Sequence, residues 1–280
     1  VFSEFGAPDV LHLQEMEKPA PKEHEILIRI RATSVNFGDV LARDFSRISP
    51  RDFSMPMPLW LPSRRAIGIR KPRKHVLGSE FAGDVEAVGA AVSRFTAGDK
   101  VFGYRGMSFG ANAEYLCMSE DGIVDLMPAC MSYEEAAAVP YGALMGLSLL
   151  QKAGVQPGQK VLINGASGGI GASLVQLAKH AGAEVTAVCG TPRLDLVKAL
   201  GADHVIDYTA EDFTRRSETL DVIFDIPVKS TFARCKGSLT ANGCYFPVSF
   251  KMKDVFQMLW TARRGGKKVV CALLAEKPEH

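Results

Sequence analysis

A glycine-rich turn that follows an apolar run places the strongest constraint on what this chain can fold into. Residues 161–190 read VLINGASGGIGASLVQLAKHAGAEVTAVCG. Within about 30 residues the chain has an apolar run, the glycines, a long amphipathic segment and a second apolar run. This is the pattern of a strand–turn–helix–strand unit that binds a dinucleotide. A turn with a purely structural role is the alternative interpretation of the same glycines.

The turn supplies what a diphosphate requires, namely bare backbone N–H groups at the start of a helix, where the helix dipole favours negative charge. We predict that Gly168 lets the backbone approach the phosphates and that Gly171 lets the helix pack closely on the sheet. The residues predicted to hold a nucleotide here are Ala166, Ser167, Gly168, Gly169, Ile170 and Gly171.

The end of the second predicted strand indicates which nucleotide binds. NAD sites usually carry an acidic residue there, which accepts a hydrogen bond from the ribose 2′-hydroxyl. This chain has Cys189, Gly190 and Thr191 followed by Arg193, and the first acid is Asp195. A small neutral turn with an arginine suits a 2′-phosphate, so the pattern favours NADPH. The alternative for Arg193 is an exposed residue at the start of a helix.

The two halves of the chain differ in pattern. Short runs of alternating apolar and polar residues, such as 25–35, with Gly-Asp and Ala-Gly turns between them, predict a β-rich, barrel-like domain over 1–128. Over 129–280, apolar runs alternate with helical patterns, which predicts an α/β domain with a doubly wound parallel sheet. Its strand candidates are Val161–Ile163, Val185–Val188, His204–Ile206, Val222–Phe224, Cys244–Phe246 and Val269–Ala272.

Two segments carry local signals. Residues 132–154 have a helical pattern in which Ser132 and Glu135 form a capping box and Pro140 breaks or kinks the helix. Residues 46–76 hold eight Lys/Arg, one Asp and five prolines, and are predicted to form a long irregular loop. That loop is either a solvated insertion or a lid whose Met and Trp side chains face a substrate while its basic rim attracts anionic groups.

The composition excludes several classes of partner. The net charge is only +2, so no overall field draws the chain to nucleic acid or to a membrane. No run approaches the ~18 apolar residues of a membrane span. The six cysteines are scattered and form no CxxC pair, which indicates reduced thiols and a cytoplasmic location. A chain that begins at Val1 is also compatible with a removed organelle leader.

Several runs resemble one known family in order and spacing. They are SVNFGDVLAR, VLGSEFAGDVEAVGAAVSRFTAGDKVFG, EEAAAVPYGAL and LGADHVIDYTAEDF. They resemble the medium-chain dehydrogenase/reductase superfamily, and within it the zinc-free quinone oxidoreductase (zeta-crystallin-like) branch. The resemblance covers nearly the whole chain and implies a GroES-like catalytic domain followed by a Rossmann NADP-binding domain. The turn is also similar to that of short-chain dehydrogenases, but none of the six tyrosines has the lysine four places on that their chemistry needs.

The resemblance implies a reaction without zinc. Where zinc alcohol dehydrogenases of the superfamily have cysteine and histidine ligands, this chain has Asn36 and Ser79, and of that ligand set only Glu80 remains. Catalytic zinc needs about three protein ligands and an open position. The four-cysteine lobe that holds structural zinc in the superfamily is missing too, so no metal is expected.

The resemblance also assigns roles to single residues. It places Asn36 near the nicotinamide ribose, which makes it the candidate catalytic residue and a candidate cofactor contact; the alternative is an asparagine that caps the next helix. Tyr208 matches a tyrosine that flanks the 2′-phosphate, so Cys189, Arg193 and Tyr208 complete the predicted cofactor set.

Some residues depart from the branch or have a supporting role in it. Asp39 and Arg43 are expected to form a supporting ion pair on one helix. Leu41 and Met145 stand where many members have tyrosine and threonine, and Val228 stands where the loop beside the nicotinamide has glycine.

The resemblance finally bears on the ends of the chain and on its assembly. It implies a first strand that Val1 enters partway through, and a segment after His280 that returns to the catalytic domain and is absent from this sequence. It implies a homodimer joined through edge strands of the Rossmann sheets, for which KKVVCALLA is the candidate edge.

These observations predict a zinc-independent oxidoreductase that transfers hydride from NADPH to a small-molecule substrate, either a quinone or an α,β-unsaturated carbonyl. The oxygens of a reduced quinone take protons from solvent, which fits a chain without an obvious histidine or tyrosine donor. Two alternatives remain open: an alcohol or carbonyl dehydrogenase of the same superfamily, and a catalytically silent NADPH-binding adaptor or sensor.

Overall fold

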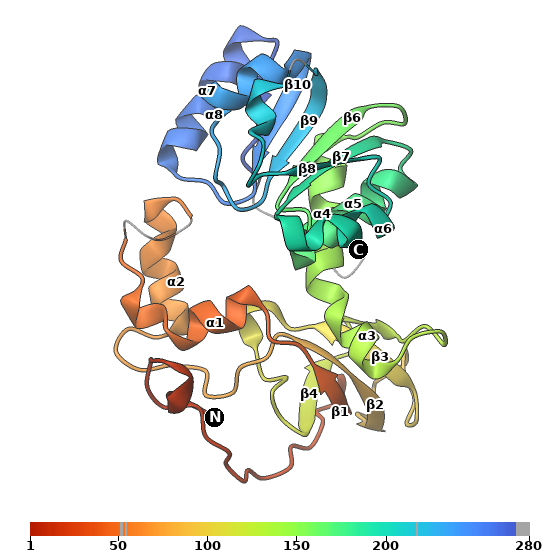
Figure 1. Cartoon of the computed structure of the whole chain (residues 1–280). Helices are drawn as coiled ribbons and strands as arrows, with labels where there is room; N and C mark the ends of the chain where they lie inside the picture. The colour runs from red at the N-terminus through yellow and green to blue at the C-terminus, as the bar shows by residue number, and fades with distance from the viewer. Residues whose placement is uncertain (51–52, 54, 217, 273–280) are drawn as a thin grey trace. The chain divides into compact units, whose positions relative to one another are not determined.

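The structure is a computed structural model that describes residues 1–50, 53, 55–216 and 218–272. The chain divides into two compact units (Figure 1), the first formed mainly by Val1–Phe53 and Pro58–Tyr141 and the second beginning at Gly142. Each unit has its own sheet and its own core, as the change of sequence pattern predicts.

The strands are β1 (Glu25–Thr33), β2 (Glu80–Val88), β3 (Lys100–Tyr104), β4 (Tyr115–Ser119), β5 (Ile123–Leu126), β6 (Lys160–Asn164), β7 (Glu184–Cys189), β8 (His204–Asp207), β9 (Leu220–Asp225), β10 (Leu239–Pro247) and β11 (Lys268–Val269). The α-helices are α1 (Phe37–Arg43), α2 (Trp60–Ile67), α3 (Tyr133–Ala138), α4 (Pro140–Ala153), α5 (Gly169–His180), α6 (Leu194–Ala199), α7 (Phe232–Cys235) and α8 (Met252–Arg264).

The first unit is built on a five-stranded antiparallel sheet in the order β4-β1-β2-β3-β5. Alternate residues of a strand point to opposite faces, and on β1 the fully buried Ile26 and Ile28 share one face. They pack in a core with Phe81, Val85, Phe95, Val101, Ala111, Leu116, Met118 and Val124. The predicted β-rich, GroES-like fold is confirmed.

The capping box and the helix break predicted around residue 135 are both confirmed. The Ser132 hydroxyl accepts a hydrogen bond from the amide of Glu135 at 3.2 Å, and the Glu135 carboxylate accepts one from the amide of Ser132 at 2.8 Å. The helix α3 that begins there ends at Ala138, and α4 begins at Pro140 because proline fits the first turn of a helix but not its interior.

Helix α3 belongs to the first unit. Ala136 and Ala137 pack against Ala82 of β2, and all three side chains are buried. The division between the units therefore falls after Tyr141, later than the boundary at 128/129 predicted from the change of pattern.

The irregular loop predicted over 46–76 is partly wrong, because this segment contains α2. The Arg64 guanidinium anchors the helix by donating hydrogen bonds to the carbonyls of Phe45 at 3.0 Å and Ile69 at 2.6 Å. Pro62 is tolerated because it lies in the first turn, where its amide needs no partner within the helix. Residues 51, 52 and 54 of the predicted loop lie outside the described residues.

The predicted strand at the N-terminus is not formed within residues 1–24, all of which the structure describes. The amide of His12 donates to the carbonyl of Val1 at 2.9 Å, and the amide of Phe2 donates to the carbonyl of His75 at 2.9 Å. The start of the chain is therefore held by these local contacts rather than by a ladder with the sheet.

The second unit is built on a six-stranded parallel sheet in the order β11-β10-β9-β6-β7-β8. On β6, Val161 and Ile163 pack in one core with α4, α5 and α6, whereas Leu162 packs in a second core with α7 and α8. Strands covered on both faces read as continuous apolar runs, which is why these strands were visible in the sequence. The predicted doubly wound α/β fold is confirmed, although β11 is shorter than the predicted Val269–Ala272.

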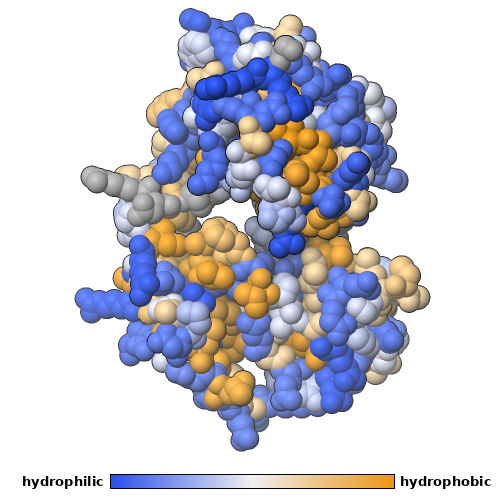
Figure 2. All heavy atoms as spheres, in the orientation of Figure 1, coloured by the Kyte–Doolittle hydropathy of each residue, from blue (hydrophilic) through white to orange (hydrophobic). Residues whose placement is uncertain are grey.

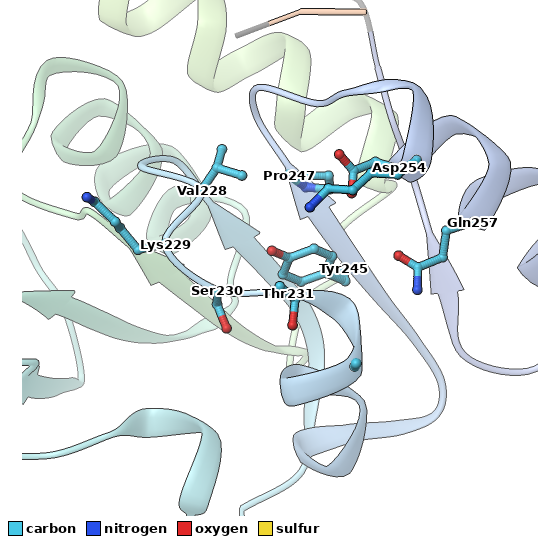
Figure 3. Close-up of a pocket in the computed structure, with 10 residues that line it drawn as sticks. Val228, Lys229, Ser230, Thr231, Tyr245, Pro247, Asp254 and Gln257 are labelled. Carbon is cyan, nitrogen blue, oxygen red and sulfur yellow. The ribbon is translucent and has the colours of Figure 1, made fainter. Parts of the chain in front are cut away.

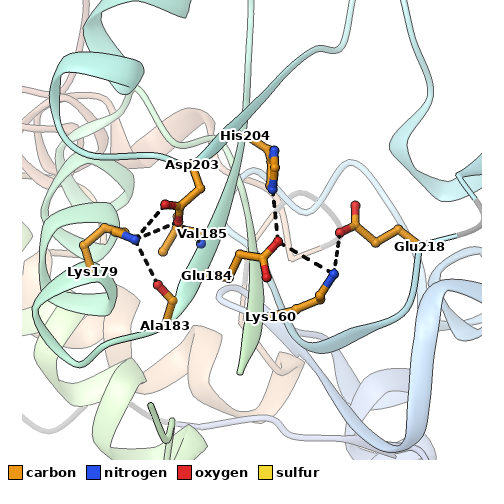
Figure 4. A network of polar contacts seen from close by, with 8 residues as sticks. All are labelled: Lys160, Lys179, Ala183, Glu184, Val185, Asp203, His204 and Glu218. Carbon is orange, nitrogen blue, oxygen red and sulfur yellow. Dashed lines mark hydrogen bonds and ion pairs between the residues drawn. The ribbon is translucent and has the colours of Figure 1, made fainter. Parts of the chain in front are cut away.

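Ionic contacts gather at the amino ends of three strands of this sheet (Figure 4). Lys160, the first residue of β6, lies 3.6 Å from Glu184, the first residue of β7, and 3.2 Å from Glu218. His204, the first residue of β8, lies 3.0 Å from the same Glu184 carboxylate. These contacts support the end of the sheet that is opposite to the carboxyl ends of the strands.

Within the part of the chain that the structure describes, no helix has the length and apolar character to cross a bilayer.

Candidate nucleotide-binding site

The order of the parallel strands identifies where a ligand would bind on the second unit. The chain reverses its direction of winding between β6 and β9, and ligands of such sheets bind at the carboxyl ends of the strands at this point. Asn164 ends β6 and is aligned with Asp225, which ends β9. The Asn164 amide nitrogen donates a hydrogen bond to the Asp225 carboxylate at 2.8 Å, so the two strand ends are held together.

The Asp225 carboxylate is fully buried and has two further donors. Its second oxygen accepts from the amide of Ser230 at 2.9 Å and from the hydroxyl of Tyr245 at 2.7 Å. Burial, and then the charge of Asp225, raise the pKa of the Tyr245 hydroxyl, which therefore stays protonated and donates. This network fixes the carboxyl ends of β6, β9 and β10 under the candidate site.

The glycine-rich turn is tied to the neighbouring strand. Gly165 adopts a φ of 85°, a conformation that favours glycine. The amides of Gly165 and Ala166 both donate to the carbonyl of Val188, at 3.0 and 3.1 Å, and the amide of Gly168 donates to the carbonyl of Gly165 at 3.2 Å. The amides of Ala166 and Gly168 are therefore already used within the protein.

Four other amides of the turn remain open. Among the described hydrogen bonds, those of Ser167, Gly169, Ile170 and Gly171 have no partner, because they precede the first residue that bonds back along α5. The cap residue Gly168 has no side chain to occupy them, and Gly168 and Gly169 are exposed. The start of α5 thus presents open donors and the positive end of a helix dipole, which is the arrangement that binds a phosphate group.

Gly171 holds α5 close to the turn. A Cβ atom added at Gly171 would lie 2.2 Å from the carbonyl oxygen of Gly165 and 2.7 Å from Cα of Ala166. Both are backbone atoms, so they can make room only if the turn or the helix moves. By contrast, a Cβ atom at Gly169 would meet nothing within 4 Å. This close approach supports the packing role predicted for Gly171.

The predicted adenosine end of the site contains Arg193 and Tyr208. Arg193 is exposed immediately before α6 and takes part in none of the described ion pairs or hydrogen bonds of side chains. Tyr208 is 63% exposed and packs against Gly190, where an added Cβ atom would lie 3.2 Å from its hydroxyl oxygen. The Cys189 side chain is buried in the core, and burial raises the pKa of its thiol, so only its main chain is available to a ligand.

The turn after β7 is less neutral than its own sequence indicates. Asp207, which ends β8, accepts hydrogen bonds from the hydroxyl of Thr191, and from the hydroxyl and the amide of Thr209 at 2.7 and 2.9 Å. These hydrogen bonds lower the pKa of Asp207. Asp207 is the last residue of β8 in the sequence, and only the alignment of Cys189 with Asp207 across two parallel strands brings this acid to the turn after β7.

On the first unit, Asn36 caps α1, which is the alternative that the sequence offers to a contact with the nicotinamide ribose. Its side-chain oxygen accepts hydrogen bonds from the amides of Gly38 and Asp39, at 2.8 and 3.2 Å. Its side-chain nitrogen donates to the hydroxyl of Ser79 at 2.7 Å and to the carboxylate of Glu80 at 3.2 Å. Both ends of the amide therefore have protein partners.

The residues at the former zinc-ligand positions bond to one another. Glu80 is only 3% exposed, and its carboxylate accepts from the hydroxyl of Ser34, from Asn36 and from the amide of Tyr141 at 2.8 Å. Asn36 in turn contacts Ser79, so an amide and a hydroxyl stand where the resemblance implies a thiolate and an imidazole, respectively. Over the described ranges, no group of three or more His, Cys, Asp or Glu side chains could hold a metal ion.

The ion pair expected between Asp39 and Arg43 is wrong. The Asp39 carboxylate instead accepts from the amides of Asn36 and Gly78, both at 3.0 Å, and burial raises its pKa. The Arg43 guanidinium donates to the carbonyl of Gly6 at 3.1 Å. Both side chains therefore fix loops from distant parts of the sequence to α1.

An apolar surface surrounds the start of α1. Phe37 is 67% exposed, Val40 is 41% exposed, and Leu61 of α2 is 62% exposed. Figure 2 shows hydrophobic side chains gathered over the part of the first unit that holds α1 and α2. Such a surface suits contact with an apolar molecule.

Val228 adopts a backbone conformation that β-branched residues rarely adopt. It has a φ of 51° and lies in the loop after β9, at the position where the resemblance implies glycine. With Ser230, Tyr245 and residues of α8 it lines a cavity of about 470 Å³ at the carboxyl end of the sheet (Figure 3). The loop therefore stores strain of roughly 1–2 kcal/mol beside the candidate site.

We expect Val228→Gly to raise the free energy of unfolding by about 0.5–1 kcal/mol, because the relief of strain exceeds the cost of a more flexible unfolded chain. Urea denaturation measures the change. The matched control is Val35→Gly at a 75% exposed valine without a positive φ, which we expect to lower stability. A loss of stability in Val228→Gly equal to that of the control would show that residue 228 is unstrained.

Known families match both units. A model described as the alcohol dehydrogenase GroES-like domain matches residues 22–129, and a model described as zinc-binding dehydrogenase matches residues 169–277. The 2-methylene-furan-3-one reductase of Solanum lycopersicum is 33% identical, over 80% of this chain and 55% of the reductase. A zinc-type alcohol dehydrogenase-like protein of Schizosaccharomyces pombe is 30% identical, over 89% of this chain and 71% of that protein. The chain thus spans little more than half the length of the first of these relatives.

Solved structures match the fold over almost the whole chain. The quinone oxidoreductase of Coxiella burnetii has a TM-score of 0.81 and 27% identity, with 99% of this chain and 83% of that chain covered. The Escherichia coli quinone oxidoreductase complexed with NADPH has a TM-score of 0.76 and 25% identity, with 99% and 82% covered. The chain belongs to the medium-chain dehydrogenase/reductase superfamily and, within it, to the quinone oxidoreductase branch.

Proposed function

We propose that this protein is an NADPH-dependent, zinc-independent oxidoreductase that transfers hydride to a quinone or to an α,β-unsaturated carbonyl. The observation that carries the proposal is the open start of α5, where four amides without described partners lie at the switch point of a parallel sheet. The E. coli relative whose structure was solved in complex with NADPH supports the choice of cofactor.

The residues of the second unit fit such a cofactor. The open amides of Ser167, Gly169, Ile170 and Gly171 would hold the diphosphate, with the Ser167 hydroxyl beside them. The exposed guanidinium of Arg193 would pair with the 2′-phosphate, and the exposed ring of Tyr208 would flank it. Bound NADPH supplies the hydride, so the chain itself has to bind, orient and shield the cofactor.

Asn36 is retained as the proposed residue near the nicotinamide ribose on the strength of the family resemblance. Its hydrogen bonds to Ser79 and to Glu80 give it a fixed orientation. A residue held in this way positions its surroundings, and no proton transfer is assigned to it.

The proposed class of hydride acceptor follows from how readily the acceptor takes up hydride without help from an acid or a metal. A quinone or an enone accepts hydride without a dedicated acid, because the reduced oxygen can be protonated by solvent, whereas a simple ketone needs a metal or a proton donor. The hydroxyl of Tyr245, buried at the strand ends, is committed to Asp225 and is not available as that donor. The apolar surface around Phe37 and Val40 also suits a ring-bearing acceptor.

The proposal extends to the assembly and to the location. Strand β11 lies at the edge of the parallel sheet, so pairing of this edge with a second copy would give the homodimer implied by the resemblance. The scattered, unpaired cysteines support a cytoplasmic location.

Turnover of matched acceptors tests the function. With NADPH, we expect kcat/KM for 2-cyclohexen-1-one and for a benzoquinone to exceed that for cyclohexanone by about 100-fold, the size of the missing general-acid contribution. Chelation should leave the rates unchanged. Preference for cyclohexanone, or loss of activity on chelation, would favour the alcohol or carbonyl dehydrogenase. Tight NADPH binding without turnover of any acceptor would favour the silent sensor, for which the strained loop at Val228 is the supporting observation.

A further inference from the structure

Helix α8 attaches to the second unit through an unusually polar side. Thr261 is only 2% exposed, and its hydroxyl oxygen accepts from the amide of Val269 at 3.1 Å and donates to the carbonyl of Met258 at 3.0 Å. Met258 packs against the core, and its sulfur accepts from the amide of Cys271 at 3.4 Å. The buried side of α8 is thus fixed to β11 by the hydrogen bond from Val269, and to the segment after β11 by the Met258 thioether.

The opposite side of α8 carries the larger apolar side chains. Met252 is 36% exposed, Phe256 64%, Leu259 50% and Trp260 46%. These positions are four, seven and eight residues apart from the first, so they form one stripe along the helix. An ordinary surface helix buries such a stripe, and α8 exposes it.

The stripe is bordered by positive charge. Residues 251–268 contain six Lys/Arg and only one acid, Asp254. The spacing of Arg263 places this residue on the same side of α8 as the apolar stripe. Lys253 and Arg264 lie beside the stripe. The Arg264 guanidinium lies 4.2 Å from the centroid of the Trp260 ring. The one carboxylate, Asp254, caps the helix by accepting from the amide of Lys251 at 2.8 Å, and it offsets only one of the six positive charges.

We infer that this surface docks on an anionic lipid membrane. It is called the α8 face below and consists of Met252, Lys253, Phe256, Leu259, Trp260, Arg263 and Arg264. A helix with Phe, Leu and Trp on one side and Lys/Arg beside them lies in the membrane interface, where its apolar side chains enter the acyl boundary and its cations meet anionic headgroups. Tryptophan and arginine both suit this boundary, since each combines an apolar body with a polar end.

The charges favour lipid over other occupants. A two-fold axis through the α8 face would bring Lys253, Arg263 and Arg264 of one copy against the same residues of the other, with no acid on the face to pair them. The face is also a convex helix surface, which a protein partner could cover only with an acidic groove of its own, whereas a membrane accepts it as it is. The small net charge of the whole chain and the lack of a spanning run predict no membrane partner, but neither property detects a local basic and apolar helix.

Vesicle binding tests the inference with the full chain. We expect the protein to sediment with sucrose-loaded vesicles of phosphatidylcholine containing about 30% phosphatidylserine, and to bind pure phosphatidylcholine at least tenfold less, since each cation near an anionic surface strengthens binding about fivefold. Raising the salt from about 0.1 M to 0.5 M should release it, because the Debye length shortens.

Two variants and one control define the surface. Phe256→Ser with Trp260→Ser should reduce vesicle binding at least tenfold, and Arg263→Gln with Arg264→Gln should abolish the preference for phosphatidylserine. Leu196→Ser, at a 41% exposed leucine of α6, is the control and should bind like the parent. Circular dichroism and NADPH affinity confirm that each variant folds.

Three results would overturn the inference. They are no binding to phosphatidylserine vesicles, equal binding to both compositions, and vesicle binding that survives the Phe256→Ser and Trp260→Ser changes. A parent that is oligomeric by sedimentation and becomes monomeric in that double variant, without lipid binding, would assign the face to a second copy instead.

Discussion

Replacing Gly171 with alanine is expected to lower the free energy of unfolding by about 3 kcal/mol, the upper part of the range for overpacking a close contact. The added Cβ would lie 2.2 Å from the backbone oxygen of Gly165, and no rotamer change relieves a clash with backbone. Because α5 must shift, its open amides also move, so affinity for NADPH should fall at least about tenfold. Urea denaturation and calorimetric titration measure the two effects.

Gly169→Ala is the matched control for this change. The same methyl group meets nothing within 4 Å there, and alanine is the better helix former, so stability should stay level or rise by up to about 1 kcal/mol. If both variants lose the same stability, the close approach at residue 171 is not what holds α5 to the turn.

Arg193→Glu is expected to weaken NADPH binding by about 100-fold while NADH affinity changes little. A charge-assisted hydrogen bond to phosphate contributes roughly 1.5–3 kcal/mol, and the glutamate adds repulsion of the 2′-phosphate. NADH has no 2′-phosphate, so it loses neither interaction. The two dissociation constants, measured by calorimetry on one preparation, give the ratio directly.

Lys198→Glu makes the same change of charge on the exposed side of the next helix, α6. It reports the effect of the general field and should alter both affinities by less than about threefold at 0.15 M salt, where the Debye length is about 8 Å. Equal losses of NADPH affinity in the two variants would mean that Arg193 makes no specific contact with the nucleotide.

The parallel sheet of the second unit was predictable because its strands are buried on both faces. Val161–Ile163 and Val185–Val188 are continuous apolar runs, and the glycines between them leave few other folds. The break at Pro140 was predictable for the same reason, since its signal is local and depends on backbone sterics alone.

The missed features depend on contacts between distant residues. The spacing of four residues on α1 predicts a pair of Asp39 with Arg43, but the Asp39 carboxylate instead accepts from the amide of Gly78, which is distant in sequence. Asp207 reaches the turn after β7 only because β7 and β8 align in parallel. The prolines around α2 predict an irregular loop, and the helix is held by hydrogen bonds from Arg64 to the carbonyls of Phe45 and Ile69, which both lie outside the helix.

Helix α8 shows a further limit of predicting buried residues from sequence periodicity, because its more apolar side is the exposed one. Its apolar stripe predicts a buried side, yet Phe256 and Trp260 are exposed and Thr261 is buried. Periodicity shows that a helix has two different sides, and only tertiary contacts show which of them faces the core.

Calorimetric titration of the unmodified protein with NADPH, and separately with NADH, tests the central claim most directly. The open amides at the start of α5 and the exposed guanidinium of Arg193 predict one NADPH bound per chain, at least about tenfold tighter than NADH. No heat with either nucleotide would contradict a nucleotide site at this turn, and tighter binding of NADH would contradict the role given to Arg193.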